Sequence, residues 1–326
     1  MRRMTKSFGD LGIVFLSALF VLAAAARSSG ARPSTQPAPA TSAQAMTPLP
    51  AGATPKAFVT ESIPTGGCNF PEPGSTNYRN AHAVPLGKVF IPTNIELPPD
   101  GGYDLLVHFH GAEPVRKLLT PLDLGLVIGT VDIGTLSGGY DRAFAAPGTF
   151  DALVSSISQE VSVVTNHPAA RPRSIILSSW SAGYGAIRRI IAPGRDDVDA
   201  IVLIDSLYSG FAPGTETPDP AELASFAALA RSAARGGPVF VVTHSSVPTY
   251  GYSSTVDTAT YLLRDVGLDD ALTAPPDSDP FGLIRARDRN HFFVRGYAGG
   301  DAAAHCAQLR LLPDILRRQV LPTLTP

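Results

Sequence analysis

Cysteine, charged side chains and tryptophan are all scarce in this chain of 326 residues. Two cysteines cannot build a disulfide-dense scaffold or a four-cysteine zinc site. Only 17% of the residues are charged and the net charge is −2. The chain therefore lacks the excess of lysine and arginine that is typical of proteins that bind nucleic acid or an anionic membrane. Thirty glycines and thirty prolines follow no three-residue period, which excludes a collagen. The hydrophobic content of 44% is enough for a buried core, so we expect a globular protein.

A long membrane-spanning run is also absent, and the apolar run near the N-terminus has the features of an export signal. The uncharged run 11–26 has 16 residues, fewer than the roughly 20 that a spanning helix needs. Arg2 and Arg3 give it a cationic start, and Ala23–Ala26 offers small residues for cleavage. We therefore predict that residues 1–26 are a signal peptide and that the protein is exported to the periplasm, the cell envelope or the medium. A retained N-terminal anchor is the alternative and would be the only route to a membrane.

The next segment differs in composition from the rest of the chain. Residues 27–57 are rich in proline, alanine, serine and threonine and show no apolar periodicity, so we predict a disordered tether. Residues 58–326 contain no comparable linker and are predicted to form one domain. Export would place Cys68 and Cys306 in a compartment that permits oxidation. We predict a disulfide bond between them, with two unrelated thiols as the alternative.

From about residue 85 onward, short apolar runs alternate with helical patterns. The predicted strands are Lys88–Ile91, Tyr103–His108, Leu126–Ile133, Ser174–Ser178, Ala200–Ile204, Pro238–Thr243 and Phe292–Tyr297. The predicted helices are Phe150–Val161, Ala182–Ile191, Pro220–Arg235, Val256–Val266 and Ala302–Val320. This alternation indicates an α/β fold with a mostly parallel central sheet and helices on both faces. The first strand and the proline-rich turns after it predict an antiparallel edge.

The sharpest motif lies where the apolar strand 174–178 passes through small residues into a helix. Ser181 stands at this turn, where a nucleophilic serine must adopt a strained backbone so that its hydroxyl projects above the sheet edge. The residues two before and two after such a serine must be small, and here they are Ser179 and Gly183. The backbone N–H of Ala182 would then face a developing oxyanion.

At this motif, and in the order of its strands, the chain resembles the α/β-hydrolase superfamily over most of residues 85–326. The superfamily's turn is Gly-x-Ser-x-Gly, and Ser179 takes the place of the first glycine. The resemblance implies an enzyme similar to serine esterases and lipases, which needs no cofactor. It also implies a second oxyanion donor in the His-Gly segment after an earlier strand. There the N–H of Gly111 or Ala112 would donate, and His110 would orient the loop.

A catalytic serine needs a base, and the base needs an orienting carboxylate. In the superfamily the chain order is serine, acid, histidine. Asp205 ends a strand, whereas Asp257 sits at a predicted helix start where the helix dipole explains it, so we prefer Asp205. His305 follows the last strand and is the preferred base. His244 faces the same edge and is ranked below it, and His291 precedes the last strand and is expected at the opposite end of the sheet.

These residues predict an exported serine hydrolase that cleaves an ester or amide of a small-molecule or polymer-linked acyl compound. Trp180 and Tyr184 flank the nucleophile and, with His110 and His244, would either wall the pocket or pack in the core. Two other hypotheses stay open. The fold could serve surface binding without catalysis. Alternatively, His108 and His110 could share one strand face in a metal-dependent hydrolase.

Overall fold

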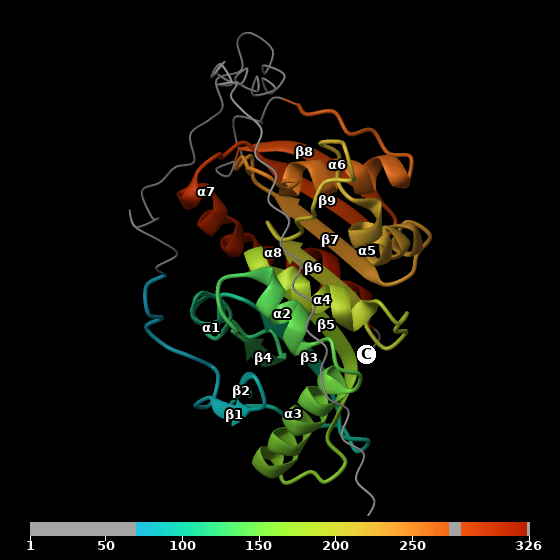
Figure 1. Ribbon diagram of the computed structural model, residues 1–326. Helices are drawn as coiled ribbons and strands as arrows, with labels where there is room; N and C mark the ends of the chain where they lie inside the picture. The colour runs from blue at the N-terminus through green and yellow to red at the C-terminus, as the bar shows by residue number, and fades with distance from the viewer. Residues whose placement is uncertain (1–69, 274–281, 325–326) are drawn as a thin grey trace, which may run out of the picture. The chain divides into compact units, whose positions relative to one another are not determined.

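The computed structural model describes residues 70–273 and 282–324, and their strands form one mixed sheet (Figure 1). Within this part of the chain the sheet has nine strands in the order β1-β2-β4-β3-β5-β6-β7-β9-β8. The strands are β1 (His82–Val84), β2 (Gly87–Phe90), β3 (Gly102–Phe109), β4 (Val127–Val131), β5 (Arg171–Trp180), β6 (Ala200–Ile204), β7 (Val239–His244), β8 (Leu283–Arg289) and β9 (Phe292–Tyr297). The predicted signal peptide and tether lie outside the described residues.

The centre of the sheet is parallel. Parallel pairs join β4 to β3, β3 to β5, β5 to β6, β6 to β7 and β7 to β9. The strands β4, β6 and β7 are buried at every position, as valine- and isoleucine-rich strands covered on both faces are expected to be. Antiparallel pairing occurs at the edges, between β1, β2 and β4 on one side and between β8 and β9 on the other. The carboxyl ends of the parallel strands therefore meet along one edge, where ligand sites form in such sheets.

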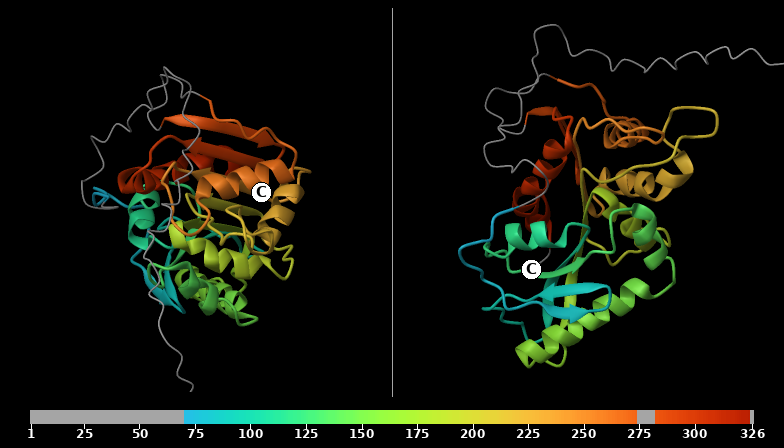
Figure 2. Two further views of the ribbon diagram at one scale, coloured as in Figure 1. Left: turned by 45° about the horizontal axis from the view of Figure 1, so that its top comes forward. Right: turned by 60° about the vertical axis from the view of Figure 1, so that its left-hand side comes forward.

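Helices cover both faces of this sheet, as the two views in Figure 2 show. One face carries α2 (Ser137–Ala143), α3 (Thr149–Thr165), α4 (Tyr184–Ile191), α5 (Pro220–Ala233) and α6 (Thr255–Asp265). The other carries α1 (Ala112–Leu119), α7 (Ala302–Ala307) and α8 (Leu312–Ile315). The buried side chains accordingly form two apolar clusters, one on each side of the sheet. The predicted fold class is confirmed.

The structure differs from the prediction in its short and half-exposed elements. The strands β1 and β8 and the helices α1 and α2 were not predicted. The strand β8 carries three arginines and an aspartate among its seven residues, which hides the apolar run expected of a strand but protects an exposed sheet edge. The predicted helix Ala302–Val320 is interrupted between α7 and α8 by a 3₁₀ turn, Gln308–Leu311. Pro313 enters α8 in its first turn, where its missing N–H is tolerated.

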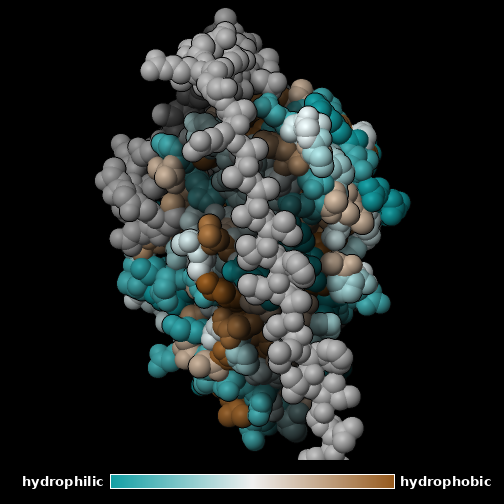
Figure 3. Space-filling model, in the orientation of Figure 1, coloured by the Kyte–Doolittle hydropathy of each residue, from teal (hydrophilic) through white to brown (hydrophobic). Residues whose placement is uncertain are grey.

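Hydrophilic residues surround the displayed face of the molecule, and hydrophobic residues gather toward its middle (Figure 3). The largest exposed apolar side chains among the described residues include Leu136, Tyr250 and Tyr252. Within the described ranges, no helix combines the length and the apolar character needed to cross a membrane.

Candidate active site

Ser181 lies at the turn between β5 and α4 in a left-handed conformation, with φ of +50°. A non-glycine residue pays about 1–3 kcal/mol for such a backbone, and this strain is concentrated at functional sites. Asp205 and His110 share it, with φ of +42° and +71°, and they directly follow the carboxyl ends of β6 and β3. Three strained residues therefore line up along one edge of the sheet.

The small residues around Ser181 are required by close packing. A Cβ atom on Gly183 would lie 2.1 Å from the carbonyl oxygen of Phe109 on β3, so only glycine fits there. On the other side of the turn, the buried hydroxyl of Ser179 lies 2.7 Å from that of Ser206. The Ser206 hydroxyl donates to the carbonyl oxygen of Ser181 at 2.8 Å. The loop after β6 thus holds the backbone of the serine turn.

Asp205 is completely buried and its carboxylate accepts three hydrogen bonds. The Ser245 N–H and the Thr255 hydroxyl donate to Oδ1 at 2.8 and 2.6 Å, and Nδ1 of His305 lies 2.6 Å from Oδ2. Burial alone would raise the pKa of Asp205, but these three hydrogen bonds outweigh burial and hold the pKa below its ordinary value. The backbone N–H of Asp205 also donates to the Thr243 hydroxyl, which fixes the strained residue from behind. The carboxylate is therefore charged and held rigidly toward His305.

In addition to its hydrogen bond with Asp205, His305 contacts the indole ring of Trp180. The indole ring of Trp180 stacks on His305 with 4.7 Å between centroids and on His110 with 5.1 Å between centroids. The indole N–H also donates to the backbone oxygen of His305 at 3.1 Å. Since Trp180 immediately precedes Ser181, this stack brings the imidazole of His305 to the serine turn.

Within the described residues, His305 Nε2 has no hydrogen-bond partner, and no hydrogen bond joins it to the Ser181 hydroxyl. Hydrogen bonds between a catalytic serine and histidine often tighten only when substrate binds. The free ring nitrogen is on the side of the imidazole opposite to Asp205, because Nδ1 is the atom that meets the carboxylate. The histidine is thus oriented with one nitrogen engaged and the other available.

Two backbone N–H groups beside Ser181 have no hydrogen-bond acceptor among the described residues, those of Gly111 and Ala182. Both residues are buried, where an unpaired N–H is costly and therefore unusual. Gly111 adopts φ of +84°, and a Cβ there would press on Trp180. The N–H of Ala112, by contrast, donates to Asp132 at 3.3 Å. Of the donors predicted from sequence, Gly111 and Ala182 are the two that remain available for an oxyanion.

His110 is anchored by residues that the sequence does not single out. Its Nδ1 lies 3.0 Å from the Tyr140 hydroxyl, which itself donates to Asp132 at 3.0 Å. Because the Tyr140 proton is used in that way, Nδ1 of His110 is the donor in their hydrogen bond. The nearby Asp132 carboxylate accepts from this cluster, and its hydrogen bonding with His110 lowers its pKa. This arrangement fixes the loop that carries Gly111.

His108 is buried below the site with both ring nitrogens engaged. Nδ1 lies 2.7 Å from the Ser178 hydroxyl and Nε2 lies 2.7 Å from the backbone oxygen of His110. Burial lowers the pKa of His108 to about 4, so the ring is neutral near pH 7 and donates from Nε2 to the carbonyl. The ring has no nitrogen left for a metal ion. Among the described residues, no group of three histidine, cysteine or acidic side chains could hold a metal.

The alternative histidines, His244 and His291, and the alternative acid, Asp257, each have partners away from the serine turn. His244 is fully buried at the end of β7, with Nδ1 at 3.0 Å from the Ser245 oxygen and Nε2 at 3.2 Å from the Arg285 guanidinium. His291 lies at the opposite end of the sheet from His305, because it precedes β9, and its Nδ1 meets a loop carbonyl at 2.6 Å. Asp257 forms a capping box at the start of α6. No hydrogen bond joins any of the three to Ser181.

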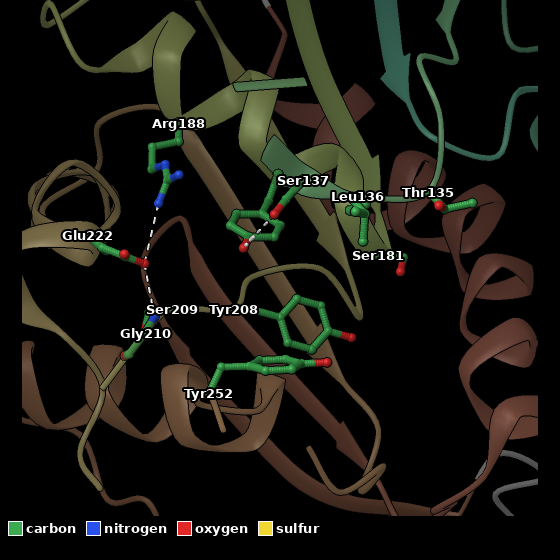
Figure 4. Close-up of a pocket in the computed structure, with 12 residues that line it drawn as sticks. Thr135, Leu136, Ser137, Ser181, Arg188, Tyr208, Ser209, Gly210, Glu222 and Tyr252 are labelled. Atoms are coloured by element: carbon green, nitrogen blue, oxygen red, sulfur yellow. Dashed lines mark hydrogen bonds and ion pairs between the residues drawn. The ribbon is translucent and has the colours of Figure 1, made fainter. Parts of the chain in front are cut away.

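A cavity of about 440 Å³ opens beside Ser181, within the range of small-molecule sites (Figure 4). Tyr184, which the sequence predicts as a pocket residue, lines it, whereas His244 does not because it is buried in the sheet edge. The remaining lining residues come mostly from loops and from helices α2, α4 and α5, and they are Thr135, Leu136, Ser137, Ala182, Arg188, Tyr208, Ser209, Gly210, Glu222 and Tyr252. Sequence reasoning missed most of these, since no motif marks them.

Cys306 is buried on α7, next to His305. Cys68 lies outside the described residues, so the disulfide bond between them stays a prediction.

The parallel sheet, the left-handed serine between β5 and α4, and the aspartate–histidine pair together form the arrangement of the α/β-hydrolase fold. No protein-family model and no curated protein matches the chain. Solved structures do align with it, and the examples below are all named peptidases or esterases.

Acylaminoacyl peptidase from Pyrococcus horikoshii is 12% identical, with a TM-score of 0.42 over 75% of this chain. This chain spans only 42% of that peptidase's length. The feruloyl esterase module from Clostridium thermocellum is 9% identical, with a TM-score of 0.43 over 82% of this chain and 95% of the module. Enterobactin esterase from Shigella flexneri is 14% identical, with a TM-score of 0.43 over 71% of this chain and 55% of the esterase. Similarity of this degree does not transfer an activity, so the chemistry must come from the residues of this chain.

Proposed function

We propose that the protein is a serine hydrolase that cleaves a carboxylic ester, or an amide, through an acyl-enzyme intermediate. The observation that carries this proposal is the 2.6 Å pair of Asp205 and His305 beside a left-handed Ser181. The buried Asp205 carboxylate already accepts two other hydrogen bonds. Its contact with His305 at a strained serine turn supports a role in orienting the histidine.

In the proposed reaction, Ser181 Oγ attacks the carbonyl carbon of the substrate while His305 Nε2 takes the serine proton. Asp205 holds the Nδ1–H of His305 and stabilises the imidazolium that forms. The N–H groups of Gly111 and Ala182 would bind the oxyanion of the tetrahedral intermediate. The imidazolium then protonates the leaving alcohol or amine. Water, activated by the same histidine, attacks the acyl-enzyme and releases the acid and the free serine.

Labelling with a fluorophosphonate, followed by peptide mapping, tests this mechanism. The reagent should modify Ser181, and Ser181→Ala should abolish both labelling and cleavage of p-nitrophenyl acetate. Ser158→Ala removes a serine from the distant helix α3 and serves as the matched control, which should be labelled normally. Labelling at another residue, or an active Ser181→Ala protein, would contradict the proposal.

The two alternatives predict different results in the same experiment. A binding protein without catalytic activity would neither be labelled nor cleave the ester. A metal-dependent hydrolase would lose activity with a chelator and would not be labelled. The metal-dependent hydrolase is disfavoured because His108 has no free ring nitrogen.

We also propose that the protein is exported, on the basis of the N-terminal sequence alone. Sequencing of the N-terminus of protein purified from the producing cells should find that about the first 26 residues have been removed. Thiol labelling should detect Cys68 and Cys306 only after reduction if the two are paired. An intact N-terminus would contradict the removal of a signal peptide, and free thiols without reductant would contradict the disulfide bond.

A further inference from the structure

The walls of the cavity beside Ser181 are aromatic and polar. Tyr184 and Tyr208 have ring centroids 5.9 Å apart, and Tyr208 and Tyr252 have centroids 5.7 Å apart at 71°. Figure 4 shows the hydroxyls of Tyr208 and Tyr252 on the side of the cavity toward which Ser181 points. Such rings offer a flat apolar face to a bound ring, and their hydroxyls offer hydrogen bonds at its rim.

One of these hydroxyls is unused by the protein. Within the described chain, the Tyr252 hydroxyl has no hydrogen-bond partner, and the side chain is 45% exposed. The Tyr208 hydroxyl makes only a long hydrogen bond of 3.5 Å to the Asp205 backbone. Burial raises the pKa of Tyr208 above its ordinary value, so this phenol stays protonated and can donate. Both tyrosines can therefore bond to a polar group of a substrate.

The far end of the cavity carries charges that are already balanced. Arg188 pairs with Asp141 at 2.9 Å and with Glu222 at 3.5 Å. Glu222 uses Oε2 for Arg188 and for the Gly210 N–H, whereas its Oε1 has no partner among the described residues. Because Arg188 is neutralised by two carboxylates, the described lining residues offer no unpaired cation to an anionic group. The free carboxylate oxygen can accept a hydrogen bond from a substrate hydroxyl.

The lining residues that the structure describes form no apolar channel for a long acyl chain. Leu136 is the one large aliphatic residue among the lining residues that the structure describes, and it is 77% exposed. A lipid chain would have to cross hydroxyls and charges, whose desolvation is costly. The cavity is therefore unsuited to long fatty acyl groups.

We propose that this cavity binds a ring that carries hydroxyl groups, so that the substrate is a phenolic or a sugar ester. This inference rests on the proposed serine hydrolase activity and specifies its substrate. The ring would pack against Tyr208 and Tyr252, and its hydroxyls would meet the tyrosine hydroxyls and Oε1 of Glu222. The phenolic and the sugar ester share this chemistry and differ in whether the ring lies on the acyl or the alcohol side.

Matched ester pairs that differ by their hydroxyl groups test the inference. Methyl 4-hydroxycinnamate is compared with methyl cinnamate, and 6-O-acetylglucose with cyclohexylmethyl acetate. We expect kcat/KM to favour the hydroxylated member of at least one pair about tenfold, and the favoured pair identifies the kind of ring. We also expect that member to be cleaved faster than a long-chain ester of matched reactivity, which is methyl decanoate for the cinnamate and decyl acetate for the sugar ester. Equal rates within both pairs, or preference for the long-chain ester, would overturn the inference.

Tyr252→Phe removes one hydroxyl and keeps the ring. It should reduce the preference for the hydroxylated ester about three- to tenfold, as expected for one lost hydrogen bond. Tyr250→Phe is the matched control, because Tyr250 is 87% exposed and does not line the cavity. A Tyr252→Phe protein with the wild-type preference would overturn the inference. The proposed function itself fails only if p-nitrophenyl acetate is not cleaved in a Ser181-dependent way.

Discussion

Replacing Asp205 by asparagine should abolish the proposed hydrolase activity by reversing the tautomer of His305. The structure fixes how the new amide must lie. Oδ1 of Asp205 receives the Ser245 N–H at 2.8 Å and the Thr255 hydroxyl at 2.6 Å. Because the Ser245 N–H can only donate, the amide oxygen of asparagine must occupy this position. The amide NH₂ then takes the place of Oδ2 and faces Nδ1 of His305.

An NH₂ group at this place forces Nδ1 of His305 to accept a hydrogen bond. The imidazole proton then resides on Nε2, which can no longer take the proton of Ser181. We expect kcat to fall about 10⁴-fold, which corresponds to about 5.5 kcal/mol of activation free energy. The fold should persist, because the amide retains both hydrogen bonds at the Oδ1 position.

Steady-state kinetics with p-nitrophenyl acetate, alongside thermal unfolding, measures both expectations. Asp257→Asn is the matched control, since Asp257 caps α6 through Ser254. It should leave kcat unchanged and cost at most about 1 kcal/mol of stability. If Asp205→Asn keeps more than a tenth of wild-type kcat, or if Asp257→Asn loses activity, the assignment of the acid is refuted.

Three other tests address the packing around the site. Burial lowers the pKa of His108 and of His244 to about 4, whereas an unfolded histidine titrates near 6.5. As the pH falls, the unfolded chain therefore binds protons before the folded one. The free energy of unfolding should keep its whole value above pH 6.5 and fall by about 3 kcal/mol per histidine as the pH approaches 4. Urea unfolding at several pH values measures this loss, and a flat profile contradicts it. Gly183→Ala should lower the melting temperature and the activity, because its Cβ would lie 2.1 Å from the Phe109 oxygen, and an unchanged melting curve would refute that contact. Trp180→Leu should reduce kcat about tenfold at similar KM by removing the ring stacked on two imidazoles, with partial recovery in Trp180→Phe; equal kcat in all three proteins would exclude a positioning role.

The central sheet could be predicted because each buried parallel strand is an apolar run bounded by turn residues. The same rule places residues that follow such strands along one edge, whatever their separation in the chain. Asp205 and His305 are 100 positions apart, and the structure has them in hydrogen-bond contact. The edge strand β8 could not be predicted in this way, because the charged residues Arg285, Arg287 and Arg289 interrupt the apolar run.

The contacts that hold the acid could not be predicted from strand order. The segment after β7 contains no carboxylate, which made it uninformative in the sequence. In the structure the end of β7 and the residue that follows it supply an acceptor and a donor: the Thr243 hydroxyl receives the N–H of Asp205, and the Ser245 N–H donates to its carboxylate. Thr255 adds a third contact from the start of α6. These interactions depend on the path of loops, which hydrophobic periodicity does not encode, and the same holds for Tyr208 of the cavity.

The structure also explains why a serine, Ser179, takes the place of the first glycine in this turn. The single proton of the Ser206 hydroxyl is donated to the Ser181 carbonyl, so the hydrogen bond between Ser206 and Ser179 must take its proton from Ser179. The hydroxyl of Ser179 therefore orders Ser206, and Ser206 in turn holds the strained Ser181 and adjoins Asp205. A glycine at position 179 would leave the buried Ser206 oxygen without a donor. The loop after β6 thus compensates for the departure from Gly-x-Ser-x-Gly. We expect Ser179 and Ser206 to tolerate replacement only when both residues are changed together.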